Sequence, residues 1–196
     1  MRPEGLAVKG LARFLFEAGM LKKMRRTGYH FLGSGGESVA DHCFRASLLG
    51  YHLALLDPAL DAPRVALMLM HHDLAESRTN DLNYVHKRYA KADEKRPPGS
   101  AGRAAARWRA DAGAGRRIRG WVKPRGPSFD ADQLDLLVEL KEQKDMGNPY
   151  ATHWIHYALK RLDTPAGQEL APAILDTGWT DWWFEKRDDW WAPPKN

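Results

Sequence analysis

The sequence has few of the features that stabilise small secreted proteins or anchor membrane proteins. Cys43 is the only cysteine among 196 residues, so the chain can form neither an internal disulfide nor a zinc site built from several cysteines. It has no run of eighteen apolar residues, and charged residues interrupt its first ten positions, where a signal peptide needs an apolar core. We therefore expect a cytoplasmic protein with no membrane segment. Any metal site must be built from histidines and carboxylates.

Positive charge is concentrated in one part of the chain. The net charge of +5 would by itself suggest an anionic partner such as nucleic acid. Residues 91–129 hold eleven Lys or Arg and only three acidic residues, which leaves the remainder of the chain slightly acidic. Within this region Pro97–Ser128 is rich in Arg, Gly, Ala and Pro and has almost no branched apolar residue. This composition predicts an atypical, mobile segment, and the local character of the charge argues against a nucleic-acid groove.

The pattern of apolar residues predicts an all-helical bundle in a single domain over residues 1–196. Apolar residues recur every three or four positions over residues 6–24, which predicts an amphipathic first helix. Further helices are expected over residues 37–56, 64–76, 130–146, 150–162 and 165–176. The helix 64–76 is apolar on almost every side, so we expect it to be central. No alternating pattern of useful length predicts a β-strand.

Ionisable side chains lie on the apolar faces of three predicted helices. His42 lies on the apolar face of helix 37–56, and His72 and Asp73 end the most apolar helix. Asp132 opens a later helix. An unpaired charge or imidazole in a protein core costs several kcal/mol, so these side chains need a partner. Two imidazoles and two carboxylates that converge from three helices would hold one divalent ion, such as Mn, Co, Fe, Mg or Zn.

The order of these residues resembles that of the HD-domain metal-dependent phosphohydrolases. The shared pattern is a single His, an adjacent His-Asp pair about thirty residues later, and a distant Asp. The segments Glu37–Arg45 and His72–Asp81 resemble the family's first two motifs, and Asp130–Leu140 resembles the helix of its last metal ligand. Arg26–Tyr29 resembles the substrate-facing loop of the 5'-deoxynucleotidase branch.

This resemblance implies a divalent-metal enzyme that removes the 5'-phosphate from a nucleoside monophosphate, most simply a deoxynucleotide. The implied metal ligands are His42, His72, Asp73 and Asp132, the catalytic residues are Glu76 and Asp81, and the substrate-binding residues are Arg26 and Tyr29. Glu76 would transfer a proton, either of the attacking water or of the leaving 5'-oxygen. Arg26 would hold phosphate oxygens, and Asp81 would contact the sugar or base. Tyr29 would stack on the sugar or exclude ribose.

The sequence departs from the family pattern in two places. Asn80 stands where relatives usually have Gly, and Asn tolerates the left-handed turn that Gly would supply. Relatives also carry an acidic, apolar helix before the last ligand, whereas this chain has Pro97–Ser128. That segment is either a divergent insertion or the product of a frameshift.

Several alternatives stay open. His71 precedes His72, but only the His next to the Asp fits the pattern, so we expect His71 to face another side. His86 is the only histidine between Asp73 and Asp132, which argues against a dinuclear iron site. The substrate could also be a nucleoside triphosphate or a cyclic nucleotide, or the chain could bind nucleic acid without catalysis. The tryptophans near the C-terminus predict an aromatic cap on the bundle or a homodimer interface.

Overall fold

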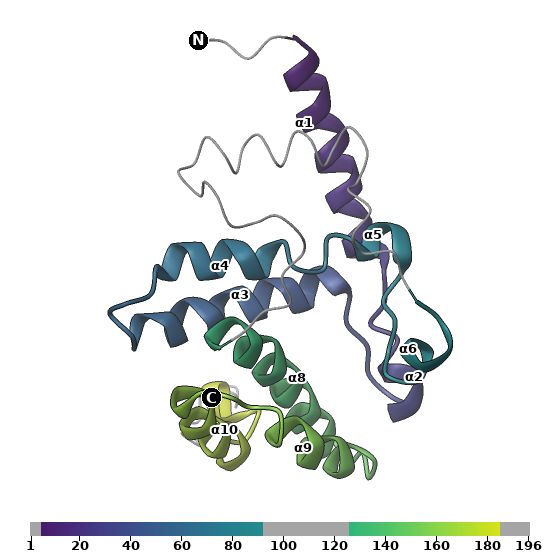
Figure 1. Ribbon diagram of the computed structural model, residues 1–196. Coiled ribbons are helices and arrows are strands. Elements are labelled where there is room, and N and C mark those ends of the chain that lie inside the picture. The colour runs from purple at the N-terminus through teal and green to yellow at the C-terminus, as the bar shows by residue number, and fades with distance from the viewer. Residues whose placement is uncertain (1–4, 92–125, 185–196) are drawn as a thin grey trace, which may run out of the picture.

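The computed structural model describes residues 5–91 and 126–184, which are mainly helical (Figure 1). In chain order the helices are α1 (Gly5–Ala18), the 3₁₀ helix η1 (Gly19–Lys23), α2 (Tyr29–Leu32), α3 (Val39–Leu55), α4 (Ala62–Met70), α5 (Glu76–Thr79), α6 (His86–Tyr89), α8 (Pro127–Asp145), α9 (Ala151–Leu159), α10 (Pro165–Asp176) and α11 (Asp181–Phe184). Within these two ranges there is no β-strand, so the prediction of an all-α fold is confirmed. None of the described helices has the length and apolar content that crossing a membrane requires.

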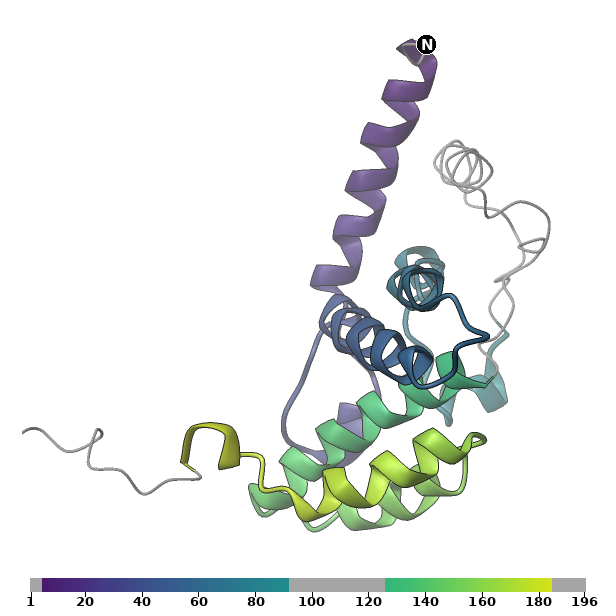
Figure 2. The same ribbon diagram turned by 90° about the vertical axis from the view of Figure 1, so that its left-hand side faces the viewer.

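Helix α3 lies at the centre of the fold. In both views α4 runs beside α3, α8 crosses beneath this pair, and α9 and α10 pack on α8 (Figures 1 and 2). The main apolar cluster fills the junction of these helices and includes Leu53, Leu69, Ala131, Leu134, Leu137 and Ile155. Asp130 ties α8 to the start of α10, because its carboxylate accepts hydrogen bonds at 2.8 Å from the backbone N–H groups of Asp163 and Thr164. The shared core thus fixes the first turns of α8 against α3.

The apolar helix expected over residues 64–76 is shorter and less central than the sequence suggested. Helix α4 ends at Met70, and residues 71–75 form turns before α5 begins. The imidazoles of His71 and His72 hydrogen-bond the carbonyls of Leu67 and Leu69, and the backbone N–H groups of the same two histidines bond carbonyls only three residues back, so the α-helical pattern ends. Met70 is 52% exposed, because the helix packs mainly on α3 and α8. The high apolar content of this helix therefore did not mean that it lies at the centre of the fold.

Two other boundaries differ from the predictions. Helix α8 begins at Pro127, so the last residues of the segment Pro97–Ser128 are helical, and Ser128 is buried. Pro at the first turn and the packing of α8 favour a helix at these two positions. The rest of that segment, to residue 125, lies outside the described residues. Helix α9 ends at Leu159, three residues before the predicted end.

Side-chain caps fix the first residues of α3, which carries His42, and of α10. Ser38 caps α3 through a reciprocal arrangement with Asp41, in which each side chain accepts a hydrogen bond from the other residue's backbone N–H. Thr164 caps α10, directly before Pro165 in its first turn, by accepting a hydrogen bond from the N–H of Gly167 at 3.1 Å. These caps fix where α3 and α10 start and therefore the register of their buried faces.

The C-terminal tryptophans do not form the expected cap within the described residues. Trp182 is 83% exposed and Trp179 is 37% exposed. Their rings contact Trp183, with centroid separations of 4.7 and 4.9 Å, instead of burying their area in the bundle. Trp190 and Trp191 lie outside the described residues.

Gly50 marks the closest approach of α3 to α4, and we expect an added methyl group there to be costly. A Cβ on Gly50 would collide with the buried Leu69 and come within 3.4 Å of Ala131. Gly50→Ala should lower the free energy of unfolding by about 1–3 kcal/mol through overpacking. This loss exceeds the gain of up to about 1 kcal/mol in helix propensity.

Urea unfolding of Gly50→Ala checks this expectation, with Gly19→Ala as the control. A Cβ on Gly19 meets no atom within 4 Å, so Gly19→Ala should be neutral or slightly stabilising. A Gly50→Ala protein as stable as the Gly19→Ala protein would show that the two helices are not held at this contact.

Candidate metal centre

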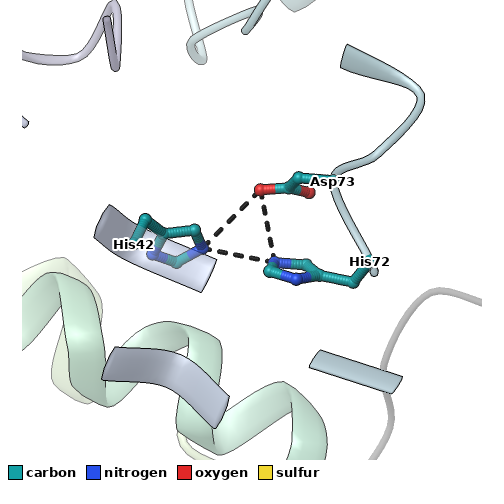
Figure 3. A group of neighbouring side chains, drawn as sticks. All are labelled: His42, His72 and Asp73. Atoms are coloured by element: carbon teal, nitrogen blue, oxygen red, sulfur yellow. Dashed lines mark hydrogen bonds and ion pairs between the residues drawn. The ribbon is translucent and has the colours of Figure 1, made fainter. Parts of the chain in front are cut away.

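The four predicted metal ligands come together at the junction of three elements. Helix α3 supplies His42, the turn after α4 supplies His72 and Asp73, and the second turn of α8 supplies Asp132. Figure 3 shows the first three side chains pointing toward one another. The two Nε2 atoms lie 3.2 Å apart, and Asp73 Oδ2 lies 3.6 Å from that of His42 and 3.2 Å from that of His72. Asp132 Oδ1 lies 3.1 and 3.6 Å from the same two nitrogens.

Both imidazoles are held with Nε2 facing this centre. His72 Nδ1 lies 2.6 Å from the carbonyl oxygen of Leu69, a group that can only accept a hydrogen bond. His42 Nδ1 lies 2.5 Å from the carboxylate of Asp135. The proton of each neutral ring is therefore on Nδ1, and the Nε2 lone pair is directed at the shared centre.

The donor atoms fit a single divalent ion. Ligands bound to one ion at about 2.0–2.2 Å lie roughly 3–3.6 Å from each other. The distances between the two imidazoles, and from each imidazole to Asp73 and to Asp132, fall in this range. Without a cation the site has an excess of negative charge and lone pairs. Although burial and Arg26 lower it, hydrogen bonds to Asp132 and Asp135 raise the pKa of His42 to about 10. In the metal-free protein a proton on His42 therefore occupies the position that suits a metal ion.

Metal binding should therefore release protons and strengthen as the pH rises. In the metal-free protein His42 remains protonated up to about pH 10, so an ion must displace that proton. The apparent affinity for Mn²⁺ should increase from pH 6 to pH 8. Calorimetric titration in two buffers of different ionisation enthalpy measures both the affinity and the protons released. An affinity that is constant over this range, with no proton release, would contradict the ligand assignment.

Arg26 lies directly beside the centre. Its guanidinium is 3.3 Å from Asp73 Oδ2, 4.0 Å from Asp81 Oδ1 and 3.9 Å from Glu37. Burial lowers its pKa, but the surrounding carboxylates, Asp73 first, raise it above the ordinary value, so the side chain stays charged. A fixed guanidinium next to the metal ligands is suited to binding an oxyanion.

Asp81 holds the loop that carries Arg26. Its Oδ2 accepts hydrogen bonds from the backbone N–H and the hydroxyl of Thr27, at 2.5 and 3.0 Å. Asn80, directly before Asp81, has a φ of +66°. This left-handed conformation was predicted from Asn at a position where relatives usually have Gly. Asp81 thus lines the pocket, but its contacts support Arg26 and Thr27.

Glu76 has a buried oxygen with no partner among the described residues. Glu76 is the first residue of helix α5. The Oε2 atom of Glu76 is fully enclosed and has no hydrogen bond. Burial and the neighbouring Asp73 and Asp81 raise the pKa of Glu76 to about 8, against the opposing effect of Arg26 and Lys87. A carboxyl group that titrates near neutral pH and lacks a protein partner is suited to exchange a proton with a bound molecule.

A pocket joins these residues to a more apolar region. It is lined by Arg26, Gly28, Tyr29, Leu32, Glu37, Asp73, Glu76, Asp81, Leu82, Asn83, Tyr84, Lys87, Asp132, Gln133, Leu136, Glu139, Leu140 and Trp154. The ring of Tyr29 forms part of this wall, and its hydroxyl bonds Glu139. All four predicted residues outside the metal centre, Arg26, Tyr29, Glu76 and Asp81, therefore share the pocket with Asp73 and Asp132.

Sequence reasoning missed a charged network behind His42. Asp135 is completely buried and accepts a hydrogen bond at 2.6 Å from Arg45 Nε, and Arg45 also pairs with Glu139 and Glu142. A signal was present, because Asp135 follows Asp132 by three residues and Arg45 follows His42 by three, which places each pair on one helix face. Glu37, His42 and Asp135 also form a possible cation cluster, but the Arg45 guanidinium already supplies a positive charge there.

The two neighbouring histidines lie away from the centre, as expected. The ring of His71 stacks on Phe14 at 6.2 Å, and its Nδ1 bonds the carbonyl of Leu67. His86 is exposed at the start of α6. Neither adds a ligand to the centre.

Comparison with known proteins agrees with this arrangement. Residues 18–102 match the HD domain family. A structural-genomics protein is 27% identical, with a TM-score of 0.62 over 89% of this chain and 99% of that chain. A conserved hypothetical protein from Pyrococcus furiosus is 21% identical, with a TM-score of 0.59 over 83% and 98% of the two chains. A protein from Pyrococcus horikoshii is 19% identical, with a TM-score of 0.60 over 84% and 98%, and these two share the fold. No curated protein matches the chain.

Residues 18–102 are therefore similar to an HD domain. The matched segment includes His42, His72 and Asp73, whereas Asp132 lies beyond it and reaches the centre through the packing of α8 on α3. At the level of the HD domain, this match agrees with the resemblance seen in the sequence.

Proposed function

We propose that this chain is a divalent-metal-dependent phosphohydrolase that removes the 5'-phosphate from deoxynucleoside monophosphates. The observation that carries the proposal is the convergence of two histidines and two carboxylates beside a partly buried arginine and an unpartnered Glu76 oxygen. A divalent ion bound by His42, His72, Asp73 and Asp132 would supply Lewis-acid chemistry and lower the pKa of water to about 7.

The other residues have separate tasks in this proposal. Arg26 binds phosphate oxygens and orients the phosphorus toward the metal centre, while Asp81 keeps the Arg26 loop in place. Glu76 accepts or donates the proton that must move as the phosphate ester bond breaks. Tyr29 and Trp154 bound the part of the pocket that receives the nucleoside. A deoxyribose 5'-phosphate thus has a charged end and an uncharged end that match the pocket.

The charge of the pocket favours a monophosphate over a triphosphate. Six acidic side chains line it (Glu37, Asp73, Glu76, Asp81, Asp132 and Glu139), against the cations Arg26 and Lys87. Burial raises the pKa of Glu37 and of Glu76 to about 8, so the other four acidic side chains supply most of the negative charge at neutral pH. A bound divalent ion and Arg26 can compensate one phosphate group, whereas further phosphates would lie beside uncompensated carboxylates. The same limit disfavours the phosphate backbone of a nucleic acid.

A substrate panel tests the proposal. Metal-free protein is reconstituted separately with Mn²⁺, Co²⁺, Mg²⁺ and Zn²⁺, and phosphate release is measured from 5'-deoxynucleotides, 5'-ribonucleotides, deoxynucleoside triphosphates and cyclic nucleotides. We expect release from deoxynucleoside monophosphates, abolished by chelator and restored by metal. Hydrolysis of triphosphates or cyclic nucleotides alone would replace the proposed substrate by one of those classes. No hydrolysis of any of them by metal-loaded protein would contradict the proposal.

A further inference from the structure

His42 owes its orientation to a side chain, and His72 owes its orientation to the backbone. The carbonyl of Leu69 fixes His72, and a carbonyl stays in place whatever residue occupies position 69. His42 instead depends on Asp135, whose Oδ2 lies 2.5 Å from His42 Nδ1 in a region with no exposed surface on either side chain. The more buried of the two imidazoles is therefore the one whose orientation a single substitution can change.

Asp135 is itself held in one orientation. Its second oxygen accepts a hydrogen bond at 2.6 Å from Arg45 Nε. Arg45 is anchored in turn by Glu139 and by Glu142, the latter at 3.3 Å. Each carboxylate oxygen of Asp135 thus has one donor, and the side chain cannot turn without breaking a charged contact.

We propose that Asp135, oriented by Arg45, is a positioning residue that fixes His42 in the tautomer with its proton on Nδ1 and Nε2 available to the metal ion. The inference rests on the proposed metal site and adds a requirement to it. A ring of the opposite tautomer would present an N–H group to the ion, and one of the ligands would be lost. Carboxylates behind metal-bound histidines are known to set both the tautomer and the ring orientation.

The variant Asp135→Asn separates this role from simple packing. The amide keeps the shape of the carboxylate, but it has only one acceptor oxygen for the two donors, Arg45 Nε–H and His42 Nδ1–H. Because the guanidinium is charged, we expect the amide oxygen to face Arg45 and the NH₂ group to face His42 Nδ1. That arrangement favours a proton on Nε2, so the affinity for Zn²⁺ should fall by about 10- to 100-fold.

The affinity for Zn²⁺ is measured by competition with a chromophoric chelator, and circular dichroism checks folding. Glu142→Gln is the matched control, because Glu142 contacts Arg45 in the same network but not His42. Its affinity should stay within about twofold of the wild type. Wild-type affinity in Asp135→Asn would overturn the proposal, and so would an equal loss in both folded variants, which would indicate a general effect of the network.

A second measurement needs no variant and decides the matter if Asp135→Asn does not fold. In the ¹⁵N spectrum of the histidine rings of zinc-loaded wild-type protein, His42 should carry its proton on Nδ1 and bind zinc through Nε2. Coordination through Nδ1 would overturn the proposal. Neither measurement uses a substrate, so failure to hydrolyse deoxynucleotides would leave this test intact and count only against the proposed function.

Discussion

A His72→Ala variant should lose both the bound divalent ion and the hydrolysis of deoxynucleotides. His72 Nε2 lies 3.2 Å from Asp73 Oδ2 and 3.6 Å from Asp132 Oδ1, so its removal takes away a donor atom that lies close to both carboxylates. Loss of a residue that only supports a ligand costs about 10- to 100-fold in metal affinity or activity. Loss of the ligand itself should cost more than about 100-fold in both.

The neighbouring histidine provides the control for this variant. His71 lies on another side of the same turn, where its ring stacks on Phe14 and its Nδ1 bonds the carbonyl of Leu67. His71→Ala should therefore keep the wild-type metal content, measured by elemental analysis, and the wild-type rate of phosphate release. If His71→Ala loses the ion and His72→Ala keeps it, the assignment of ligands is wrong.

A Glu76→Gln variant should keep the metal ion and lose most of its turnover. Glutamine has the shape of glutamate but cannot take up or give away the proton that the reaction requires. General acid–base groups contribute about 10²- to 10⁴-fold, and kcat should fall by that factor. The metal content should not change, because Glu76 is not one of the four proposed ligands.

Glu17→Gln is the matched control for Glu76→Gln. Glu17 contacts Arg78 and Ser77 on α5 and does not line the pocket. Its replacement should leave kcat unchanged in the same phosphate-release assay. A wild-type kcat in Glu76→Gln, or loss of its metal ion, would remove Glu76 from proton transfer.

Much of the site could be predicted because its residues are unusual for their positions. His42, His72, Asp73 and Asp132 lie where an amphipathic helix should be apolar, and the structure brings them within ion-pair distance. The backbone conformation of Asn80 could be predicted, because the turn there needs a positive φ that Asn tolerates. These predictions depend on local sequence and on the spacing of a known motif.

The parts that could not be predicted depend on partners far apart in the sequence. Asp135 and Arg45 are separated by 90 positions, and each alone is an ordinary charged residue on a helix. Likewise, α4 ends at Met70 because imidazoles bond its last carbonyls, an event that hydrophobic periodicity does not report. Periodicity identifies the helices, whereas side-chain hydrogen bonds decide where they end.

Crystals of the protein soaked in Zn²⁺ or Mn²⁺ and measured at the absorption edge of the metal test the central claim most directly. We expect one anomalous peak in the described region, about 2.0–2.3 Å from His42 Nε2, His72 Nε2 and carboxylate oxygens of Asp73 and Asp132. A fully occupied peak at Glu37 and Asp135, or no peak among the four residues at saturating metal, would contradict the assignment of this centre.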